Sequence, residues 1–513
     1  MRVELNILDY LRRAVAVYGE RTAMVDADTD GELASVTYSS LLRRANNMAA
    51  NLEEMGIGHG DRVAILSPNS SRFLISFFGV SGHGRVLVPI NYRLNREEVA
   101  YILEHSGAEV LLIDPEYAAA LAGLEVKHRI VLDGIQDRDL FAATDRSPST
   151  PWPGDEDATA SINYTSGTTA RPKGVQLTHR GLWINAAIMG WHLGVNDRDV
   201  YLHTLPMFHC NGWGMPYGVS GMGGKHVNLR AIDGEEILAR IEEHGVTLLN
   251  GAPAVVQRIL EAAAARLAAG VTVPGRAQVR MVVAGAPPPS SVIAQLEDEL
   301  GWEFIQIYGL TETSPLLTMS RTRQEWDDLD TAGRAQRLVR AGAPVIGVDL
   351  QLSPDGEILA RSNHVFDGYW DQPDQTDQAM EGGWFHTGDG AVMDGPYVVV
   401  TDRKKDVIIT GGENVSSIEV EDCLYQHPAV AECAVIGVPD ETWGETVKAI
   451  VVLRPDAEAD VQALIDHCRD RLAHYKCPKS VDFAHELART ATGKLQKFLI
   501  RAPYWDGRER QVN

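Results

Sequence analysis

A run of small hydroxyl and glycine residues between Tyr164 and Gly174 is the stretch of this chain best suited to bind an anion. Its backbone N–H groups, its hydroxyl donors and the ammonium of Lys173 can converge on one phosphate. It lacks the G-x-x-x-x-G-K-[ST] order of the common P-loop. The flanking segments 162–164 and 174–177 predict two strands, which places the run at the tip of a hairpin. The alternative is a flexible polar loop, which the composition alone predicts equally well.

Polar residues also follow two predicted strands at their carboxyl ends. Tyr308 can stack on adenine, Thr311 can hold a phosphate oxygen, and Glu312 can bind Mg²⁺ as a hard oxygen ligand. The turn at Gly285 allows a flat ring to approach the backbone closely. Each of these is an ordinary strand-end turn when taken alone. Together with the hydroxyl-rich run they predict a nucleotide site.

Two single residues could act chemically only in the right context. His209 lies in the apolar run Pro206-Met207-Phe208-His209-Cys210-Asn211-Gly212-Trp213, where a lone histidine is usually a structural core residue. Lys494 follows Thr490-Ala491-Thr492-Gly493 near the end of the sequence, where a lone lysine is ordinarily a solvated charge.

Size and composition narrow the classes of protein. A chain of 513 residues is too long for one core, and its 44% apolar and 23% charged residues are those of an ordinary globular protein. The formal charge of −23 argues against nucleic acid or an anionic membrane as the main partner. Five cysteines without C-x-x-C spacing suit reduced thiols in a cytoplasm. No signal peptide and no membrane-spanning stretch are expected.

The apolar periodicity predicts an α/β fold. Residues 41–55 show helical spacing, with Tyr38-Ser39-Ser40 as the expected cap, and short apolar strands at 62–66, 85–89 and 110–113 alternate with further helices. Beyond Asp328, short segments at 345–352, 357–360 and 368–370 predict a small β-rich subdomain. The last hundred or so residues predict a compact α+β unit, with helices at 417–426 and 461–472 and strands at 432–438 and 446–453.

Six segments, in this order and at this spacing, resemble the motifs of the adenylate-forming superfamily, and specifically its fatty or medium-chain acyl-CoA synthetases. Besides those above, they include Trp384-Phe385-His386-Thr387-Gly388-Asp389 and Asp402-Arg403-Lys404-Lys405-Asp406. The chain departs from the usual family residue at Ala170, Gly390 and Ala488. The resemblance covers essentially the whole chain. It implies a large N-terminal domain of residues 1–402, a hinge at 403–405 and a mobile C-terminal domain of residues 406–513.

The resemblance also implies a role for each matching residue. The catalytic residues would be Lys494, His209, Glu312 and Thr311, with Glu312 and Thr168 at the metal. The nucleotide would be bound by Thr165, Ser166, Gly167, Thr168, Thr169, Lys173, Gly285, Ala286, Pro287, Tyr308, Gly309, Thr311, Asp389 and Arg403. The acyl pocket would be formed by His209, Asn211, Gly212, Trp213, Met215 and Gly309. Coenzyme A would contact Gly411, Gly412, Trp443 and Lys476, and the backbone would pivot at Lys405.

The expected reaction joins a carboxylic acid to coenzyme A, using ATP and Mg²⁺, through an acyl adenylate. The acid is expected to be largely apolar, because Trp213, Met215, Ile188 and Trp191 are near the motif and no cation is reserved for a second carboxylate. Two alternatives stay open: an enzyme that loads a carrier protein's phosphopantetheine, and a non-catalytic adenylate-binding sensor. The expected partners are the acid, ATP and CoA, with a homodimer as a further expectation, in the cytoplasm.

Overall fold

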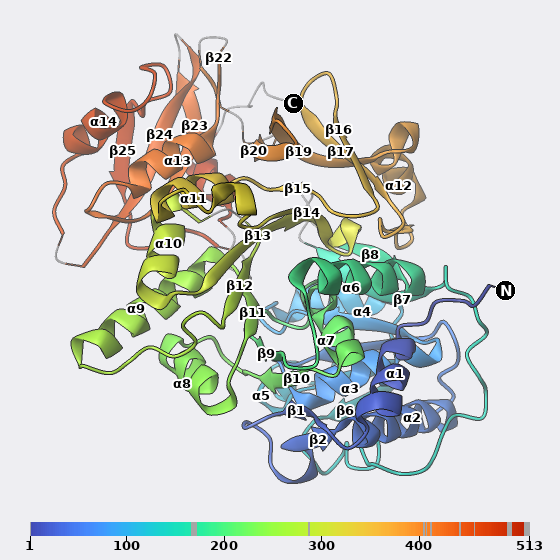
Figure 1. Ribbon diagram of the computed structural model, residues 1–513. Coiled ribbons are helices and arrows are strands. Elements are labelled where there is room, and N and C mark those ends of the chain that lie inside the picture. The colour runs from blue at the N-terminus through green and yellow to red at the C-terminus, as the bar shows by residue number, and fades with distance from the viewer. Residues whose placement is uncertain are drawn as a thin grey trace.

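Two large sheets with helices between them form most of the chain in the computed structural model (Figure 1). The structure describes residues 2–165, 172–285, 288–403, 406, 408–410, 413–440, 443–455, 457–489 and 495–506. The predictions for Ser166, Gly167, Thr168, Thr169, Ala286, Pro287, Lys405, Gly411, Gly412 and Lys494 therefore lie outside the described residues.

The first sheet has seven strands in the order β18-β8-β7-β4-β3-β5-β6. Their bounds are β3 (Arg62–Leu66), β4 (Val86–Ile90), β5 (Val110–Ile113), β6 (His128–Val131), β7 (Thr159–Thr165), β8 (Lys173–Thr178) and β18 (Gly368–Tyr369). Strands β7, β4, β3, β5 and β6 run parallel, as short apolar strands between helices predict, and the antiparallel β7–β8 pair is the expected hairpin.

The second sheet has nine strands in the order β15-β14-β13-β12-β11-β9-β10-β1-β2. Their bounds are β1 (Thr22–Val25), β2 (Ser35–Thr37), β9 (Val200–His203), β10 (Lys225–Asn228), β11 (Leu248–Gly251), β12 (Arg280–Val283), β13 (Glu303–Gly309), β14 (Leu316–Ser320) and β15 (Ala343–Pro344). The six central strands from β13 to β1 are parallel, so their carboxyl ends lie along one edge of the sheet.

Helices cover both sheets and fill the space between them (Figure 1). The core that joins the two sheets contains side chains of α2 (Tyr38–Glu54), α3 (Ser71–Gly79), α6 (His179–Leu193) and α7 (Met215–Met222). The other helices of the large domain are α1 (Leu8–Tyr18), α4 (Arg96–Ser106), α5 (Pro115–Ala118), α8 (Gly234–His244), α9 (Pro253–Ala268), α10 (Ser290–Gln295), α11 (Thr331–Leu338) and α12 (Pro373–Ala379). Helices α8 to α11 cover the outer face of the nine-stranded sheet.

Two smaller sheets follow. The first has the order β16-β17-β19-β20, with β16 (Val348–Leu352), β17 (Glu357–Ser362), β19 (Phe385–Asp394) and β20 (Tyr397–Arg403). The second belongs to the small C-terminal domain, drawn in orange to red in Figure 1, with β21 (Ile408–Thr410), β22 (Glu413–Val415), β23 (Val430–Asp440), β24 (Gly444–Leu453) and β25 (Ser480–Phe483). Its helices are α13 (Ser417–Tyr425), α14 (Val461–Arg469) and α15 (Lys497–Arg501). The α/β class with a large and a small domain is confirmed.

Three local predictions were wrong. Thr37, not Tyr38-Ser39-Ser40, caps α2, because the Thr37 side chain accepts a hydrogen bond from the backbone N–H of Ser40. Strand β18 pairs with β8 of the seven-stranded sheet and does not join the small β-rich sheet. Tyr308 and Gly309 lie within β13 and not after it.

Candidate functional site

The β7–β8 hairpin holds the base of the hydroxyl-rich run. Thr165 and Lys173 are register partners at the loop end of this hairpin, and residues 166–172 connect them. Gly174 is required at this place, because a Cβ there would lie 2.9 Å from Cγ2 of Ile162 and 3.2 Å from Cβ of Trp370. The Trp370 N–H donates to the Gly174 carbonyl at 2.7 Å, which fastens β18 beside the hairpin.

Tyr369 joins two predicted site residues that the sequence places far apart. The Lys173 ammonium lies 4.5 Å from the centroid of the Tyr369 ring, and the Tyr369 hydroxyl donates to Oε1 of Glu312 at 2.9 Å. Burial and then the Glu312 charge raise the pKa of Tyr369, so its hydroxyl keeps the proton that it donates. Sequence reasoning treated Tyr369 only as a strand residue. An aromatic residue on a two-residue strand gives no other signal, so only the pairing of β18 with β8 reveals its role.

Asp389 lies at the meeting point of two motifs. Its Oδ2 accepts a hydrogen bond from the Tyr308 hydroxyl at 2.8 Å, and it is the register partner of Arg403 across the β19–β20 ladder. Asp389 is buried. The structure thus brings together the residues expected at the adenine and at the ribose.

Glycines shape the ends of β12 and β13. Gly285 has a φ of 96°, in the left-handed region that the expected turn requires. A Cβ on Gly309 would lie 1.6 Å from the carbonyl oxygen of Pro315, so no side chain fits at this position. Gly309 therefore lets the backbone at Pro315 pack directly against the end of β13, and Gly285 provides the turn that follows β12.

The expected acyl segment forms a tight turn, Cys210–Gly214, before α7. Asn211, Gly212 and Trp213 have φ values of 50°, 60° and 59°. Oδ1 of Asn211 accepts a hydrogen bond from the Ser161 hydroxyl of β7 at 3.1 Å, and the Cys210 thiol donates to the Thr311 carbonyl at 3.9 Å. The segment therefore contacts both the β7–β8 hairpin and Thr311, with the partly buried His209 directly before the turn.

One residue predicted to line the acyl pocket lies elsewhere. Trp213 and Met215 are buried, with 4% and 1% of their surface exposed, but Trp191 is 78% exposed on the outside of α6. Trp191 therefore does not line an acyl pocket. Helix α6 is apolar around most of its circumference, so its sequence pattern could not tell its buried face from its exposed face.

The predicted CoA residues that the structure describes lie in the C-terminal domain. Trp443 is 54% exposed at the turn between β23 and β24, where its backbone N–H donates to Oδ1 of Asp440 at 2.9 Å. The Lys476 ammonium lies 2.8 Å and 2.7 Å from the two carboxylate oxygens of Glu419.

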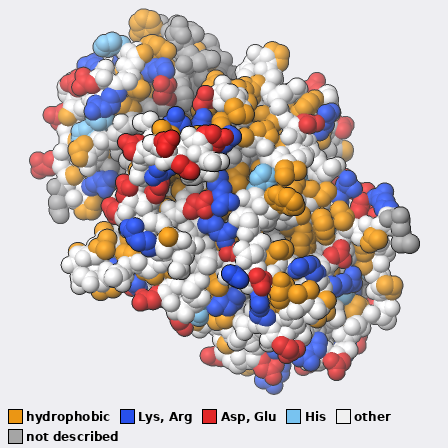
Figure 2. Space-filling view, in the orientation of Figure 1, with side chains coloured by type: hydrophobic (Ala, Val, Ile, Leu, Met, Phe, Trp, Pro, Cys, Tyr) orange, Lys and Arg blue, Asp and Glu red, His pale blue; other side chains and the backbone are white. Residues whose placement is uncertain are grey.

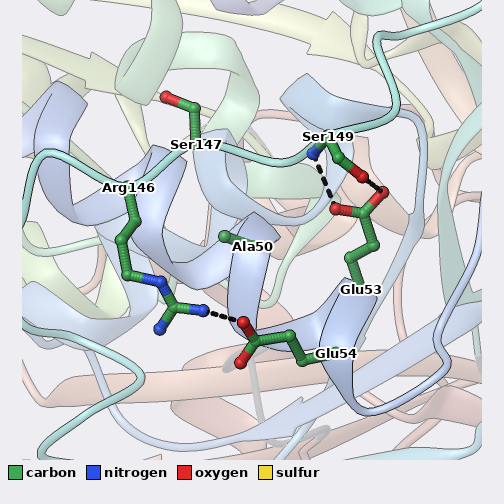
Figure 3. A pocket seen from close by; sticks show the side chains of 6 residues that line it. All are labelled: Ala50, Glu53, Glu54, Arg146, Ser147 and Ser149. Carbon is green, nitrogen blue, oxygen red and sulfur yellow. Dashed lines mark hydrogen bonds and ion pairs between the residues drawn. The ribbon is translucent and has the colours of Figure 1, made fainter.

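A pocket of about 410 Å³ lies away from all of these residues, between α2 and the segment before β7 (Figure 3). The Glu53 carboxylate there accepts hydrogen bonds from the N–H and hydroxyl of Ser149 at 2.7 Å and 2.9 Å, and from Thr150. The Thr150 hydroxyl and the Ser149 groups lower the pKa of Glu53 to about 2. These contacts fasten a long connection to α2, which is a structural role.

Within the described residues, no helix is long and apolar enough to cross a membrane. The same residues contain no group of three or more histidine, cysteine, aspartate or glutamate side chains arranged around a metal.

Comparison with known proteins identifies the family. The AMP-binding enzyme family matches residues 11–370, and the AMP-binding enzyme C-terminal domain matches residues 419–494. A 2-methylpropanoate–CoA ligase of Humulus lupulus, CCL4, is 36% identical, over 97% of this chain and 94% of its own length. The crystal structure of the anthranilate CoA ligase AuaEII with anthranoyl-AMP superposes with a TM-score of 0.86 at 26% identity, over 98% of both chains.

A further solved structure carries the nucleotide and the metal. The o-succinylbenzoate CoA synthetase MenE of Bacillus subtilis, in complex with ATP and a magnesium ion, has a TM-score of 0.81 at 27% identity, over 95% of this chain and 98% of its own. These matches cover both domains and confirm the resemblance expected from the sequence motifs. The chain belongs to the AMP-binding enzymes of the adenylate-forming superfamily and is of the acyl-CoA synthetase type.

Proposed function

We propose that the protein activates a carboxylic acid with ATP to give an acyl adenylate and pyrophosphate, and then transfers the acyl group to coenzyme A. The observation that carries this proposal is the convergence of the Tyr308–Asp389 pair and the Lys173–Tyr369–Glu312 group. Each group combines residues from segments distant in the sequence. One suits a nucleoside and the other suits phosphates beside a metal.

The first step needs charge control at the phosphates. A carboxylate is a poor electrophile. Its attack on the α-phosphate of ATP forms the bond from the carboxylate oxygen to phosphorus and breaks the bond to pyrophosphate, so the acid becomes a mixed anhydride with AMP. Lys173, the first residue of β8, supplies a positive charge, and Thr311, two residues after the end of β13, supplies a hydroxyl. We assign the bridging of the acid's carboxylate and the α-phosphate to Lys494.

A magnesium ion fits the donor set at Glu312. The hydrogen bond from Tyr369 at 2.9 Å holds the Glu312 carboxylate, which is a hard oxygen ligand. Mg²⁺ is commonly bound through one or two carboxylates plus substrate phosphates, so one acidic side chain without a protein cage is the expected arrangement. When bound, the ion would neutralise phosphate charge, and Thr168 is the second residue that we assign to it.

The second step requires a thiol at the same acyl carbon. We propose that residues 1–402 and 406–513 are the two domains and that the backbone pivots at Lys405, so that different C-terminal residues face the site in each step. We assign the pantetheine arm of CoA to Gly411, Gly412 and Trp443, and its phosphates to Lys476. Trp443 is 54% exposed, so its indole is accessible for a contact with CoA.

The acid is proposed to be a short or medium-chain acid with a largely apolar body. Buried Trp213 and Met215 support this, because they give the acyl segment apolar walls. The relatives act on acids as different as 2-methylpropanoate and anthranilate, according to their names. A carrier-protein ligase and a non-catalytic sensor are not favoured, because the relatives matched over both domains are named CoA ligases.

A panel of carboxylic acids tests the function. Pyrophosphate release is measured with each acid and ATP, and then the mass of the thioester is measured with CoA present. We expect release with at least one acid, and the mass of its acyl-CoA only when CoA is added. Release without any thioester would contradict CoA as the acceptor, and the absence of release with every acid would contradict the enzyme itself.

Two further proposals concern the cellular compartment of the protein and its association into dimers. The five cysteines, all within the described residues, form no disulfide bond with one another, which supports a reducing compartment such as the cytoplasm. Apolar side chains gather over α6 (Figure 2), where Trp191 and Ile346 are 78% and 58% exposed. This surface supports association of two copies of the chain, which light scattering coupled to gel filtration tests.

A further inference from the structure

Three polar side chains form a row across neighbouring strands of the nine-stranded sheet. Asn228 of β10 is the register partner of His203 of β9. Asn250 of β11 lies beside His203, because Leu248 pairs with Tyr201 two residues earlier on both strands. The row continues from Asn250 to its register partner Val282 on β12. All three polar residues are fully buried.

The row faces the core between the two sheets. Tyr201, Leu248 and Val282 point the same way as the row by strand alternation, and they belong to the same core as Trp213 and Met215 of the acyl segment. The intervening residues Leu202, Leu249 and Val283 belong to the core on the opposite face.

Several polar atoms of the row have no hydrogen-bond partner within the described part of the chain. They are Nδ1 of His203, Oδ1 of Asn228, and both Oδ1 and Nδ2 of Asn250. A buried polar atom left without a partner is costly, and native structures satisfy nearly all of them with protein, water or ligand. Four such atoms on three adjacent strands therefore call for a partner of their own.

Histidine chemistry allows the row to offer either a donor or an acceptor. Nε2 of His203 lies 3.0 Å from Nδ1 of His226, whose Nε2 lies 3.0 Å from the Ser220 hydroxyl of α7. Burial lowers the pKa of His226 to about 3 and that of His203 well below its ordinary value, so both rings are neutral at pH 7. Reversing the direction of this chain of hydrogen bonds converts Nδ1 of His203 from donor to acceptor.

The row lies close to the carboxyl edge of the sheet, where the proposed nucleotide and acid site begins. Val282 precedes Ala284, next to the Gly285 turn, by two residues, which is about 7 Å along a strand. The loop that leads into the acyl segment is anchored on the same strands. Thr204 donates from its hydroxyl to the Asn250 carbonyl at 2.6 Å, and Asn69 bonds to the carbonyl of His203 and to the N–H of Met207, each at 2.7 Å.

We propose that Asn250 and His203 form the far end of the acid site, and that they bind a hydroxyl or carbonyl oxygen carried near the far end of an otherwise apolar acid. This inference rests on the proposed function and names its substrate class. The row lies about 7 Å along the strand from the Gly285 turn. This distance matches an oxygen on the fourth to sixth carbon of the acid.

Matched pairs of acids test the inference on the wild-type protein. Each pair replaces a terminal hydroxyl by a methyl group: 4-hydroxybutanoate with pentanoate, and 6-hydroxyhexanoate with heptanoate. A third pair is 4-oxopentanoate with 4-methylpentanoate. We expect at least one oxygen-bearing acid to exceed its partner in kcat/KM by roughly ten-fold or more, the factor for losing a buried hydrogen bond. Equal or lower values for all three oxygen-bearing acids would overturn the inference and show that the row binds water only.

Substitutions then test whether Asn250 causes the preference for oxygen-bearing acids. Asn250→Leu keeps the volume and removes both amide atoms, so it should reduce the preference to below about three-fold by favouring the apolar acid. The control is Tyr201→Phe, which removes another buried hydroxyl without a described partner, one step deeper on β9. Tyr201→Phe should keep the wild-type ratio. A retained preference in Asn250→Leu, or an equal loss in both variants, would overturn the assignment. Absence of turnover with every acid would instead count against the proposed function.

Discussion

The Tyr308 hydroxyl donates a hydrogen bond of 2.8 Å to Oδ2 of Asp389, which joins the end of β13 to the small sheet that contains β19. The bond connects the residue expected to stack on adenine with the residue expected to bind the ribose hydroxyls. A nucleoside bound at this place would contact two sheets at once, so the position of Asp389 depends on Tyr308.

Substitutions at this pair should affect ATP binding unequally. Asp389→Asn removes the charge that accepts the ribose hydrogen bonds, and should raise KM for ATP about 10- to 100-fold in the adenylation step. Tyr308→Phe keeps the ring and removes one hydrogen bond, so its effect should be about 2- to 10-fold. Pyrophosphate exchange at varied ATP measures both. An unchanged KM in Asp389→Asn would remove Asp389 from the nucleotide site.

Tyr369→Phe should make the enzyme more dependent on Mg²⁺. Without the hydroxyl, Glu312 loses the bond that holds it, while the ring still packs against Lys173. We expect the Mg²⁺ concentration for half-maximal pyrophosphate release to rise several-fold, with most of kcat restored at saturating Mg²⁺. Tyr397→Phe is the control, since Tyr397 is also buried but bonds Arg323. The same Mg²⁺ dependence in Tyr369→Phe and wild type would contradict this role.

Trp443→Ala should impair only the thioester step. Its indole is 54% exposed, so the substitution should leave the melting temperature unchanged. We expect KM for CoA to rise about ten-fold or more, from the loss of an aromatic contact with the pantetheine arm, while pyrophosphate release without CoA stays the same. Trp191→Ala, at a 78% exposed tryptophan on α6, controls for loss of a surface indole. Unaltered CoA kinetics in Trp443→Ala would place the thiol channel elsewhere.

Lys494→Ala should separate the half-reactions. If the lysine stabilises charge only in the first transition state, adenylation should fall about 10²- to 10³-fold. A supplied acyl adenylate should still react with CoA at nearly the wild-type rate. Rapid quench of each half-reaction measures the two rates, and an equal loss in both would contradict the assignment.

The Glu53 contacts should make part of the stability depend on pH. The pKa of Glu53 is lowered to about 2 by Thr150 and Ser149, so the folded state favours the charged carboxylate. Its contribution is fully present above the ordinary glutamate pKa, near 4.5, and is lost as the pH falls from there towards 2. Glu53→Gln should therefore be less stable than wild type at pH 7, with a smaller difference at pH 3.

Urea denaturation at the two pH values measures this difference, with Glu54→Gln as the control. Glu54 makes an exposed ion pair with Arg146, and such pairs contribute little. A stability difference for Glu53→Gln that is the same at pH 7 and pH 3 would show that the carboxylate charge is unimportant. Both variants should keep full activity, because this pocket lies away from the site.

Much of the fold could be predicted because local patterns decide it. The apolar runs at β3 and β5 each follow from a few neighbouring residues. The hairpin around the hydroxyl-rich run was predictable for the same reason. Motif order then placed Tyr308 and Asp389 in one site, and the structure joins them by a hydrogen bond.

Long-range pairing was the part that the sequence could not provide. Tyr369 reaches Glu312 only because β18 adds to β8 at the edge of a distant sheet. The row of Asn228, His203 and Asn250 depends on strand order, since no two of its members are neighbours in the sequence. Trp191 was placed wrongly because α6 is apolar on its exposed face as well as on its buried face.

The fate of an oxygen atom tests the central claim most directly. The acid that the panel selects is labelled with ¹⁸O in its carboxylate, and the products with ATP and CoA are weighed by mass spectrometry. Attack of the carboxylate on the α-phosphate predicts that AMP carries one ¹⁸O, with one acyl-CoA formed for each AMP. Label in inorganic phosphate instead, with ADP as the nucleotide product, would show an acyl phosphate pathway and contradict the account.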